Sequence, residues 1–203
     1  MRFKALFMHF REMNNYFIVS MLIFATGIVL GYGYSEQFDN MLQSQIKGLE
    51  SLARSISEKE NSVLWLFGFI FLNNAIKSVL IIFAGIFFGV LPIGFLLING
   101  MVVGYLAELQ ANAGELGFFF KAIVPHGIIE IPAIIVACAY GIKFGAIMAK
   151  GMLRLFSSQG RNAFAADLEQ FLKITVPLVI LLVGSLLAAA IIESTITPWI
   201  VQL

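Results

Sequence analysis

The chain of 203 residues is 60% hydrophobic and only 12% charged, and its formal net charge is +1. A soluble domain carries about 25% charged residues, and a fold of this length cannot hide so much apolar surface from water. These totals exclude a water-soluble globular protein, and the small net charge argues against a nucleic-acid partner. We therefore expect one membrane domain over residues 1–203, surrounded by membrane lipid.

Five apolar stretches predict an all-α fold, a polytopic membrane helix bundle with about five transmembrane helices. A helical crossing of the bilayer needs about 20 apolar residues. The stretches cover residues 16–34, 63–88, 91–108, 126–148 and 171–192, with the second break at Gly89–Pro92, where glycine and proline favour a turn. A shorter apolar run, 118–124, is open to interpretation as a re-entrant half-helix that stops at Pro125, which would then begin the fourth span.

Charge in the polar segments predicts which side of the membrane each one faces. Residues 35–62 repeat apolar side chains every three to four positions, which is typical of an amphipathic helix against the membrane or the bundle. The N-terminal arm and residues 150–173 both carry more basic than acidic residues, which favours the cytoplasm. We expect the N-terminus and 150–173 in the cytoplasm, and 35–62 and the C-terminus outside the cell membrane.

Few polar residues fall within the predicted spans, and the cost of charge in lipid requires them to face the bundle interior. His126 and Glu130 are one helical turn apart and share a face. We expect an intramembrane polar site made of Asn73, Asn74, Lys77, Asn99, His126 and Glu130. Two roles stay open: a staple between helices, with Glu130 neutralised by Lys77 or by a histidine hydrogen bond, or a site for a ligand, an ion or a proton.

Small residues spaced four apart occur in several spans and predict close helix packing, since they let helix backbones approach in lipid. The positions are Gly27, Gly31, Gly85, Gly89, Gly100, Gly104, Ala133, Ala137, Gly141 and Gly145. The repeated spacing indicates a tightly packed bundle and is also compatible with a homodimer.

Enzyme signatures are absent from the sequence: there is no phosphate-binding loop, no His-Glu-x-x-His and no Gly-x-Ser-x-Gly. Two histidines and one cysteine exclude a closed structural zinc site of the His/Cys type within one chain. We expect no catalytic residue, no metal and no cofactor. His9 is expected at the surface of the N-terminal arm, and Cys138 is expected to be a small packing residue.

Four sequence blocks in order, FLNN (71–74), GIFFG (85–89), LLINGMVVG (96–104) and PHGIIEIPAI (125–134), resemble the stage II sporulation protein M family. On that pattern the motif positions are Asn73, Asn74, Asn99, Gly100, Pro125, His126, Gly127 and Glu130. The resemblance implies a non-enzymatic, multi-pass membrane scaffold that assembles with cell-wall-degrading partners when the forespore is engulfed. The PHG-x-x-E version is typical of a broader group that includes organisms without spores.

Two functions follow as hypotheses. The first is a membrane assembly platform that recruits partner proteins, such as membrane-associated cell-wall hydrolases or other complex subunits, through segments 35–62 and 150–173. The second is a transporter or channel for an ion or small solute, which would use the polar site beside the interrupted 108–125 region.

Overall fold

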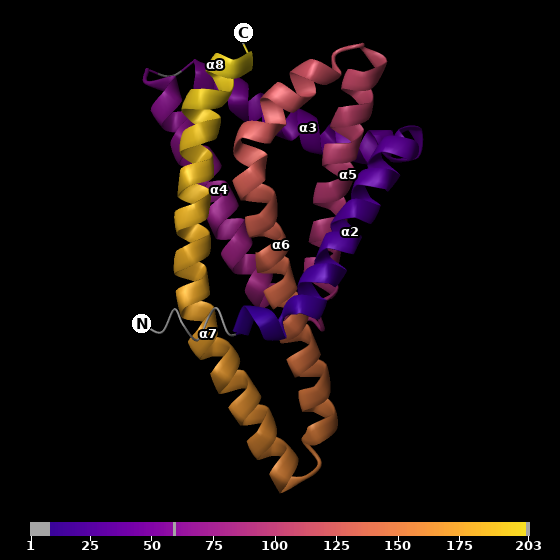
Figure 1. Ribbon diagram of the computed structural model, residues 1–203, viewed down its shortest axis with the longest axis vertical. Coiled ribbons are helices and arrows are strands. Elements are labelled where there is room, and N and C mark those ends of the chain that lie inside the picture. The colour runs from indigo at the N-terminus through magenta and orange to yellow at the C-terminus, as the bar shows by residue number, and fades with distance from the viewer. Residues whose placement is uncertain (1–8, 59, 202–203) are drawn as a thin grey trace.

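A computed structural model describes residues 9–58 and 60–201, and this part of the chain contains helices and turns but no strand. The five predicted membrane spans are confirmed, because five helices are long and apolar enough to cross a bilayer. The helices in chain order are α2 (Asn14–Gly33), α3 (Ser35–Ser57), α4 (Ser62–Ala84), α5 (Val90–Asn112), α6 (Leu116–Arg154), α7 (Ser158–Ile191), the π-helix η1 (Ile192–Ile196) and α8 (Thr197–Val201) (Figure 1).

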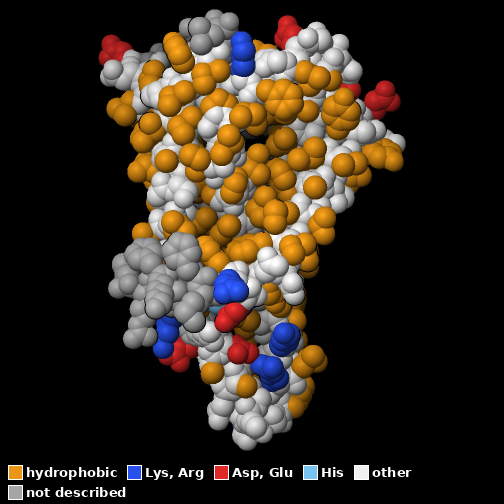
Figure 2. Space-filling view, in the orientation of Figure 1, with side chains coloured by type: hydrophobic (Ala, Val, Ile, Leu, Met, Phe, Trp, Pro, Cys, Tyr) orange, Lys and Arg blue, Asp and Glu red, His pale blue; other side chains and the backbone are white. Residues whose placement is uncertain are grey.

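Helix α8 lies at the top of the bundle in Figure 1, and the described start of the chain, the darkest indigo ribbon, lies about midway along the molecule. The α5–α6 turn, α3 and α8 lie at one end, which we call the α8 end. The N-terminal segment and the α6–α7 turn lie toward the other, which we call the hairpin end. Hydrophobic side chains cover the body between them, and charged side chains gather toward the two ends on the face shown in Figure 2. This distribution fits a molecule that spans a bilayer.

Glycines make the contact between α2 and α5 unusually close. A Cβ added to Gly27 would lie 3.0 Å from the Cα of Gly100, and one added to Gly104 would lie 2.9 Å from the backbone nitrogen of Tyr32. Gly31 faces the backbone of Met101 in the same way. The two small-residue motifs therefore pack against each other within one chain.

A second crossing of this kind joins the α4–α5 turn to α6. A Cβ on Gly85 would collide with the backbone of Gly141, and one on Gly145 would collide with the backbone of Gly89. Gly89 adopts a left-handed φ of +79°, which a glycine tolerates. The turn covers residues 85–89, so it begins earlier than the predicted break at Gly89–Pro92, and Pro92 lies in the first turn of α5. Because these motifs are used inside the chain, they no longer argue for a homodimer.

Helix α6 corrects the expectation for residues 118–125. They form no separate half-helix, and Pro125 does not begin a span; both belong to one continuous helix of 39 residues. Pro125 and Pro132 lie inside it and each removes a backbone N–H from the helical ladder. The first turns of α6 accordingly bend away from its long axis (Figure 1).

The fourth and fifth spans are also longer than the sequence predicts, because residues 150–173 form no separate polar connector. They complete α6 and begin α7, with a turn at 155–157. The result is a helical hairpin, residues 144–171, that projects beyond the N-terminal segment (Figure 1). From Lys143 to the end of α6, eleven residues at 1.5 Å each reach about 16 Å.

His9 lies against the base of this hairpin, contrary to its expected place at the surface. It is only 4% exposed, its Nε2 is 2.9 Å from Nζ of Lys143, and its ring lies 5.7 Å from that of Tyr140. Hydrophobic residues around it form the main core, in which Cys138 is fully buried, as a packing residue would be.

Helix α3 carries the amphipathic pattern and packs on the α8 end of the bundle. Its Leu42 is fully buried with Met101 and Tyr105 of α5. The hydroxyl of Tyr105 donates a hydrogen bond to Asp39, which anchors the polar side of this contact.

Candidate functional site

A polar cavity of about 410 Å³ lies among α4, α5, α6 and η1. Every residue predicted for the intramembrane polar site lines it: Asn73, Asn74, Lys77, Asn99, His126 and Glu130. Apolar side chains, among them Phe24, Ile70 and Phe95, make up most of the remaining wall. The arrangement is that of a membrane-protein site, in which a few polar groups meet inside an apolar frame.

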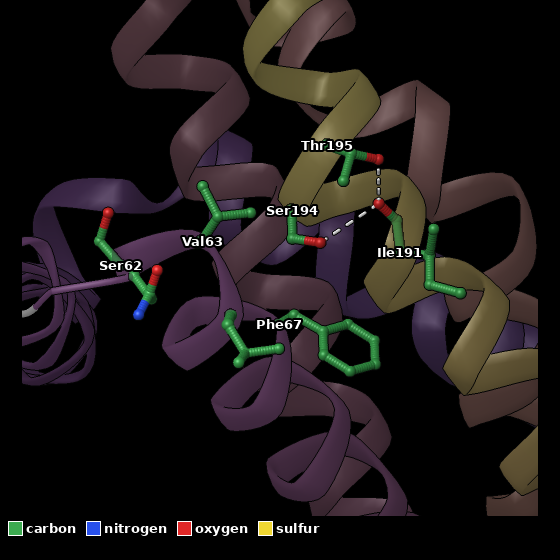
Figure 3. A pocket seen from close by; sticks show the side chains of 8 residues that line it. Ser62, Val63, Phe67, Ile191, Ser194 and Thr195 are labelled. Carbon is green, nitrogen blue, oxygen red and sulfur yellow. Dashed lines mark hydrogen bonds between the residues drawn. The ribbon is translucent and has the colours of Figure 1, made fainter.

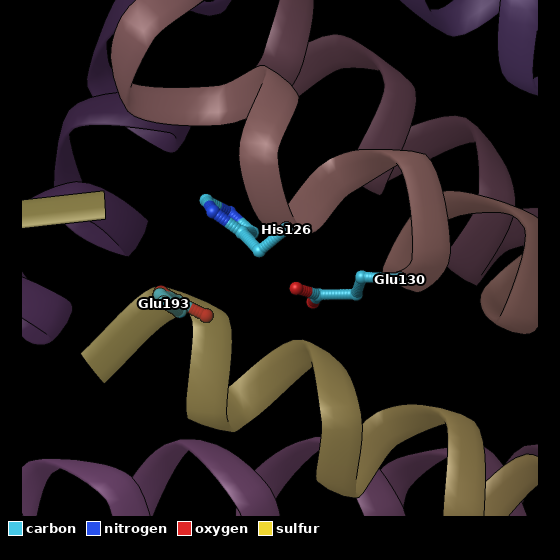
Figure 4. Close-up of side chains that lie close together, drawn as sticks. All are labelled: His126, Glu130 and Glu193. Carbon is cyan, nitrogen blue, oxygen red and sulfur yellow. The ribbon is translucent and has the colours of Figure 1, made fainter. Parts of the chain in front are cut away.

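Three ionisable side chains converge on this cavity. His126 and Glu130 project from successive turns of α6, and Glu193 faces them from η1 (Figure 4). One ligand atom from each residue lies within 4.8 Å of the others, and all three side chains are partly buried. The site therefore joins the beginning of the fourth spanning helix to the end of the fifth.

Glu130 is held by an amide and not by the expected lysine. Nδ2 of Asn74 donates to Oε1 of Glu130 at 2.9 Å, and Nδ2 of Asn73 donates to Oδ1 of Asn74 at 3.2 Å. Among the described residues, no ion pair joins Lys77 to either glutamate. Lys77 lines the cavity but is exposed and lies beyond ion-pair distance, so Asn74, and not Lys77, makes the direct contact that bridges α4 to α6.

Asn99 and His126 also line the cavity, but neither forms a side-chain hydrogen bond to another helix in the described part of the chain. Asn99 donates to the carbonyl of Phe95 at 2.7 Å within its own helix, so it faces the cavity without bridging to another span. Nδ1 of His126 is buried and has no hydrogen-bond partner among the residues that the structure describes. A buried polar atom without a partner is uncommon and calls for an explanation such as a bound ion or water.

Glu193 is the site residue that the sequence analysis missed. It follows the apolar stretch that was ended at residue 192, but the helix continues through η1 into α8. A Ser/Thr-rich segment with Pro198 allows the π-turn: Pro198 has no N–H, and the hydroxyls of Ser194, Thr195 and Thr197 bond to carbonyls of Ile191 and Ile192. The sequence signal that could have identified Glu193 is a single acidic residue directly after an apolar stretch.

The two carboxylates cannot both be ionised here without compensation. Two unit charges 4.8 Å apart repel by about 3–4 kcal/mol at an effective dielectric constant of about 20. A proton or a cation between Glu130 and Glu193 would relieve that repulsion. The site is therefore suited chemically to hold a positive charge.

The polar site lies on a part of α6 that is long and apolar enough to span a bilayer. Along α6, Glu130 lies about 20 Å and His126 about 26 Å from Lys143, which contacts the N-terminal segment.

Two other pockets lie elsewhere in the molecule. An open apolar groove of about 520 Å³ lies between the start of α4 and the end of α7 (Figure 3). Its Ser194 and Thr195 hydroxyls are already bonded to the carbonyl of Ile191. The other hollow, about 350 Å³, lies at the hairpin base, where His9, Lys143 and Lys150 are mixed with Glu12 and Asp167. Among the described residues, neither pocket brings together a group of possible metal ligands like His126, Glu130 and Glu193.

Comparisons with known proteins agree with this architecture. The sequence pattern of the family described as Stage II sporulation protein M matches residues 20–198. Two relatives are uncharacterized proteins of Methanocaldococcus jannaschii. One is 29% identical over 183 residues, covering 89% of this chain and 93% of that protein; the other is 25% identical over 182 residues, covering 89% and 77%. No solved structure matches significantly. The chain belongs to the stage II sporulation protein M family.

Proposed function

We propose that this membrane protein is a non-enzymatic assembly platform, which docks partner proteins through the hairpin 144–171. The observation that carries the proposal is a rigid helical arm, projecting past the bundle, with large apolar side chains exposed at its tip. The positive-inside count supports a cytoplasmic arm and a C-terminus outside the cell membrane.

The hairpin is built as a stiff element. At its base the rings of Phe144 and Phe171 stack with centroids 4.8 Å apart. Farther out, Gly151 leaves room for the ring of Phe164, where a Cβ would collide. Arg154 pairs with Asp167 at 2.8 Å. Contacts at three levels hold α6 and α7 together along the arm.

The turn is also fixed by local hydrogen bonds. The hydroxyl of Ser157 accepts from the backbone N–H of Gly160 at 3.0 Å and caps the start of α7. Nη1 of Arg161 donates to the carbonyl of Leu155 at 3.1 Å. An ordered tip presents its side chains with less conformational entropy to lose on binding.

The tip itself is apolar. Leu153 is 79% exposed and Phe156 is 93% exposed, and Met152 and Leu155 beside them are exposed too. These side chains lie beyond the lipid-spanning body, where exposed apolar groups are costly unless a partner covers them. Aromatic and aliphatic anchors with a basic surround of Lys150, Arg154 and Arg161 are typical of a protein-docking surface.

A photo-crosslinking amino acid at position 156, expressed in native membranes, tests the platform. We expect a discrete crosslinked partner from position 156 and none from position 162, an exposed asparagine on the same hairpin. The double substitution Leu153→Gln and Phe156→Gln should abolish the complex without unfolding the protein, because both side chains are exposed. No crosslink specific to position 156, or a complex that survives the double substitution, would overturn the platform.

The polar cavity favours a second candidate, passage of an ion or small solute. Ionisable residues inside a membrane bundle commonly mark a pathway. Flux measured in liposomes decides this: the transport function requires flux in the wild type that is lost in Glu130→Gln. Equal flux for the two proteins, or none above empty liposomes, would exclude it.

A further inference from the structure

The convergence of His126, Glu130 and Glu193 supports an inference that is independent of both proposed functions. These three residue types are metal ligands, and they come from two different spanning helices. Figure 4 shows the two carboxylates directed toward one another with the imidazole ring beside them. Two ligand atoms at about 2.1 Å from a tetrahedral Zn²⁺ lie about 3.4 Å apart. The donor atoms, within 4.8 Å of one another, would have to close by at most about 1.4 Å, which rotations of these side chains can supply.

Charge balance in the membrane favours a divalent cation at this position. Two carboxylates and one neutral imidazole carry a charge of −2, which one divalent ion neutralises. A single shared proton would leave one negative charge on the two acids. Lys77, which also lines the cavity, is exposed and forms no ion pair with either acid in the described part of the chain, so its positive charge offsets theirs only from a longer distance.

The surroundings also orient the donors as a metal site requires. Asn74 binds Oε1 of Glu130 and leaves the second carboxylate oxygen for an ion. Such outer hydrogen bonds fix the direction of a metal ligand. Nδ1 of His126 is buried without a hydrogen-bond partner among the described residues. A bound ion would give such an atom a partner.

We propose that His126, Glu130 and Glu193 bind one divalent transition-metal ion, which ties α6 to η1. An imidazole with two carboxylates suits Zn²⁺ or Mn²⁺, whereas Ca²⁺ and Mg²⁺ prefer oxygen ligands alone. Three protein ligands leave at least one coordination position open to the cavity, as in metal sites that are not purely structural. The expectation of no metal rested on the small number of histidines and cysteines, which excludes a closed His/Cys zinc site but does not bear on a site of one histidine and two glutamates.

The test uses the full chain, purified in detergent and freed of metal with a chelator. Titration with ZnCl₂ or MnCl₂, followed by calorimetry and metal analysis, should give one bound ion per chain. The ion should also raise the unfolding temperature. His126→Gln and Glu193→Gln, which lie on different helices, should each weaken binding by at least the 10–100-fold that loss of an outer partner typically costs. Asn74→Ala, as an outer-partner change, should weaken it less than either ligand substitution.

Glu115→Gln is the matched control, because Glu115 is an exposed acid at the same end of the molecule. It should bind the ion as the wild type does. Wild-type protein that neither binds Zn²⁺ or Mn²⁺ nor gains thermal stability from them would overturn the proposal, even if a variant failed to fold. Binding that is equal in the wild type and both ligand variants would place the ion elsewhere and also overturn it. Ca²⁺ bound as tightly as Zn²⁺ would overturn the assignment to a transition metal.

Discussion

Gly27 and Gly100 lie so close that a Cβ added to either would lie 3.0 Å from the Cα of the other. In lipid, apolar side chains gain nothing by leaving a water phase, so helices associate through close packing and interhelical hydrogen bonds. Helices α2 and α5 associate through close packing. Helices α4 and α6 are joined by the hydrogen bond between Asn74 and Glu130.

Gly100→Leu should destabilise the fold severely, because the new side chain would separate α2 from α5. Overpacking typically costs about 1–3 kcal/mol, and more where backbone is the obstacle. A chain of this size loses about 2–4 °C of unfolding temperature per kcal/mol. We therefore expect a fall of about 10 °C or a failure to fold, measured by thermal unfolding in detergent.

Gly94→Leu is the control for that change. Gly94 belongs to the same helix, but an added Cβ meets nothing within 4 Å. The unfolding temperature of this variant should stay close to that of the wild type. Similar losses for Gly94→Leu and Gly100→Leu would show that the contact with α2 does not set the cost, since leucine has the higher helix propensity at both positions.

Asn74→Ala should destabilise the protein by about 1–2 kcal/mol, because it removes a hydrogen bond between spans and leaves Glu130 without its amide partner. Asn99→Ala is the comparison, since its bond to Phe95 stays within one helix. Chemical unfolding in mixed micelles measures both free energies. An equal cost for the two substitutions would contradict the bridging role of Asn74.

His9 should make stability depend on pH near neutrality. Its burial, and then the positive charge of Lys143, lower the pKa of His9 below its ordinary value of 6.5, against a smaller opposite effect of Glu12. As pH falls through about 6.5, the unfolded chain takes up a proton that the folded chain resists. Stability should therefore fall with pH in this range, and level off below the folded pKa.

His9→Gln isolates this effect, because the amide does not titrate. The unfolding temperature of the wild type should drop more between pH 7.5 and 5.5 than that of His9→Gln, while the two proteins differ least in slope above pH 7.5. Parallel curves across the whole range would show that other groups control the acid response.

The proposed orientation predicts opposite labelling of the two ends. In a Cys138→Ala background, cysteine at position 156 should react with a membrane-impermeant maleimide only after cells are opened. Cysteine at position 113, in the exposed α5–α6 turn, should react in intact cells. The reverse pattern would invert the topology, and labelling of both in intact cells would contradict the five-span arrangement.

The sequence by itself determined the number and order of the spanning helices. Each apolar segment can cross the bilayer because of its own length and hydropathy, which are local properties. The same local reasoning placed His126 and Glu130 on one face, and located the turn near Gly89. It failed at Pro125, where a continuous helix tolerates the proline, and at residues 150–173, whose polarity was taken for a connector although their helices continue.

Only the tertiary structure decided which groups meet. Gly27 faces Gly100, and Gly85 faces Gly141. Asn74, and not Lys77, holds Glu130, and Glu193 joins the polar site from far along the chain. The physical reason is that these contacts depend on helix rotation and crossing. Those are set by backbone approach at the glycines and by a π-turn, which no pattern within one segment specifies.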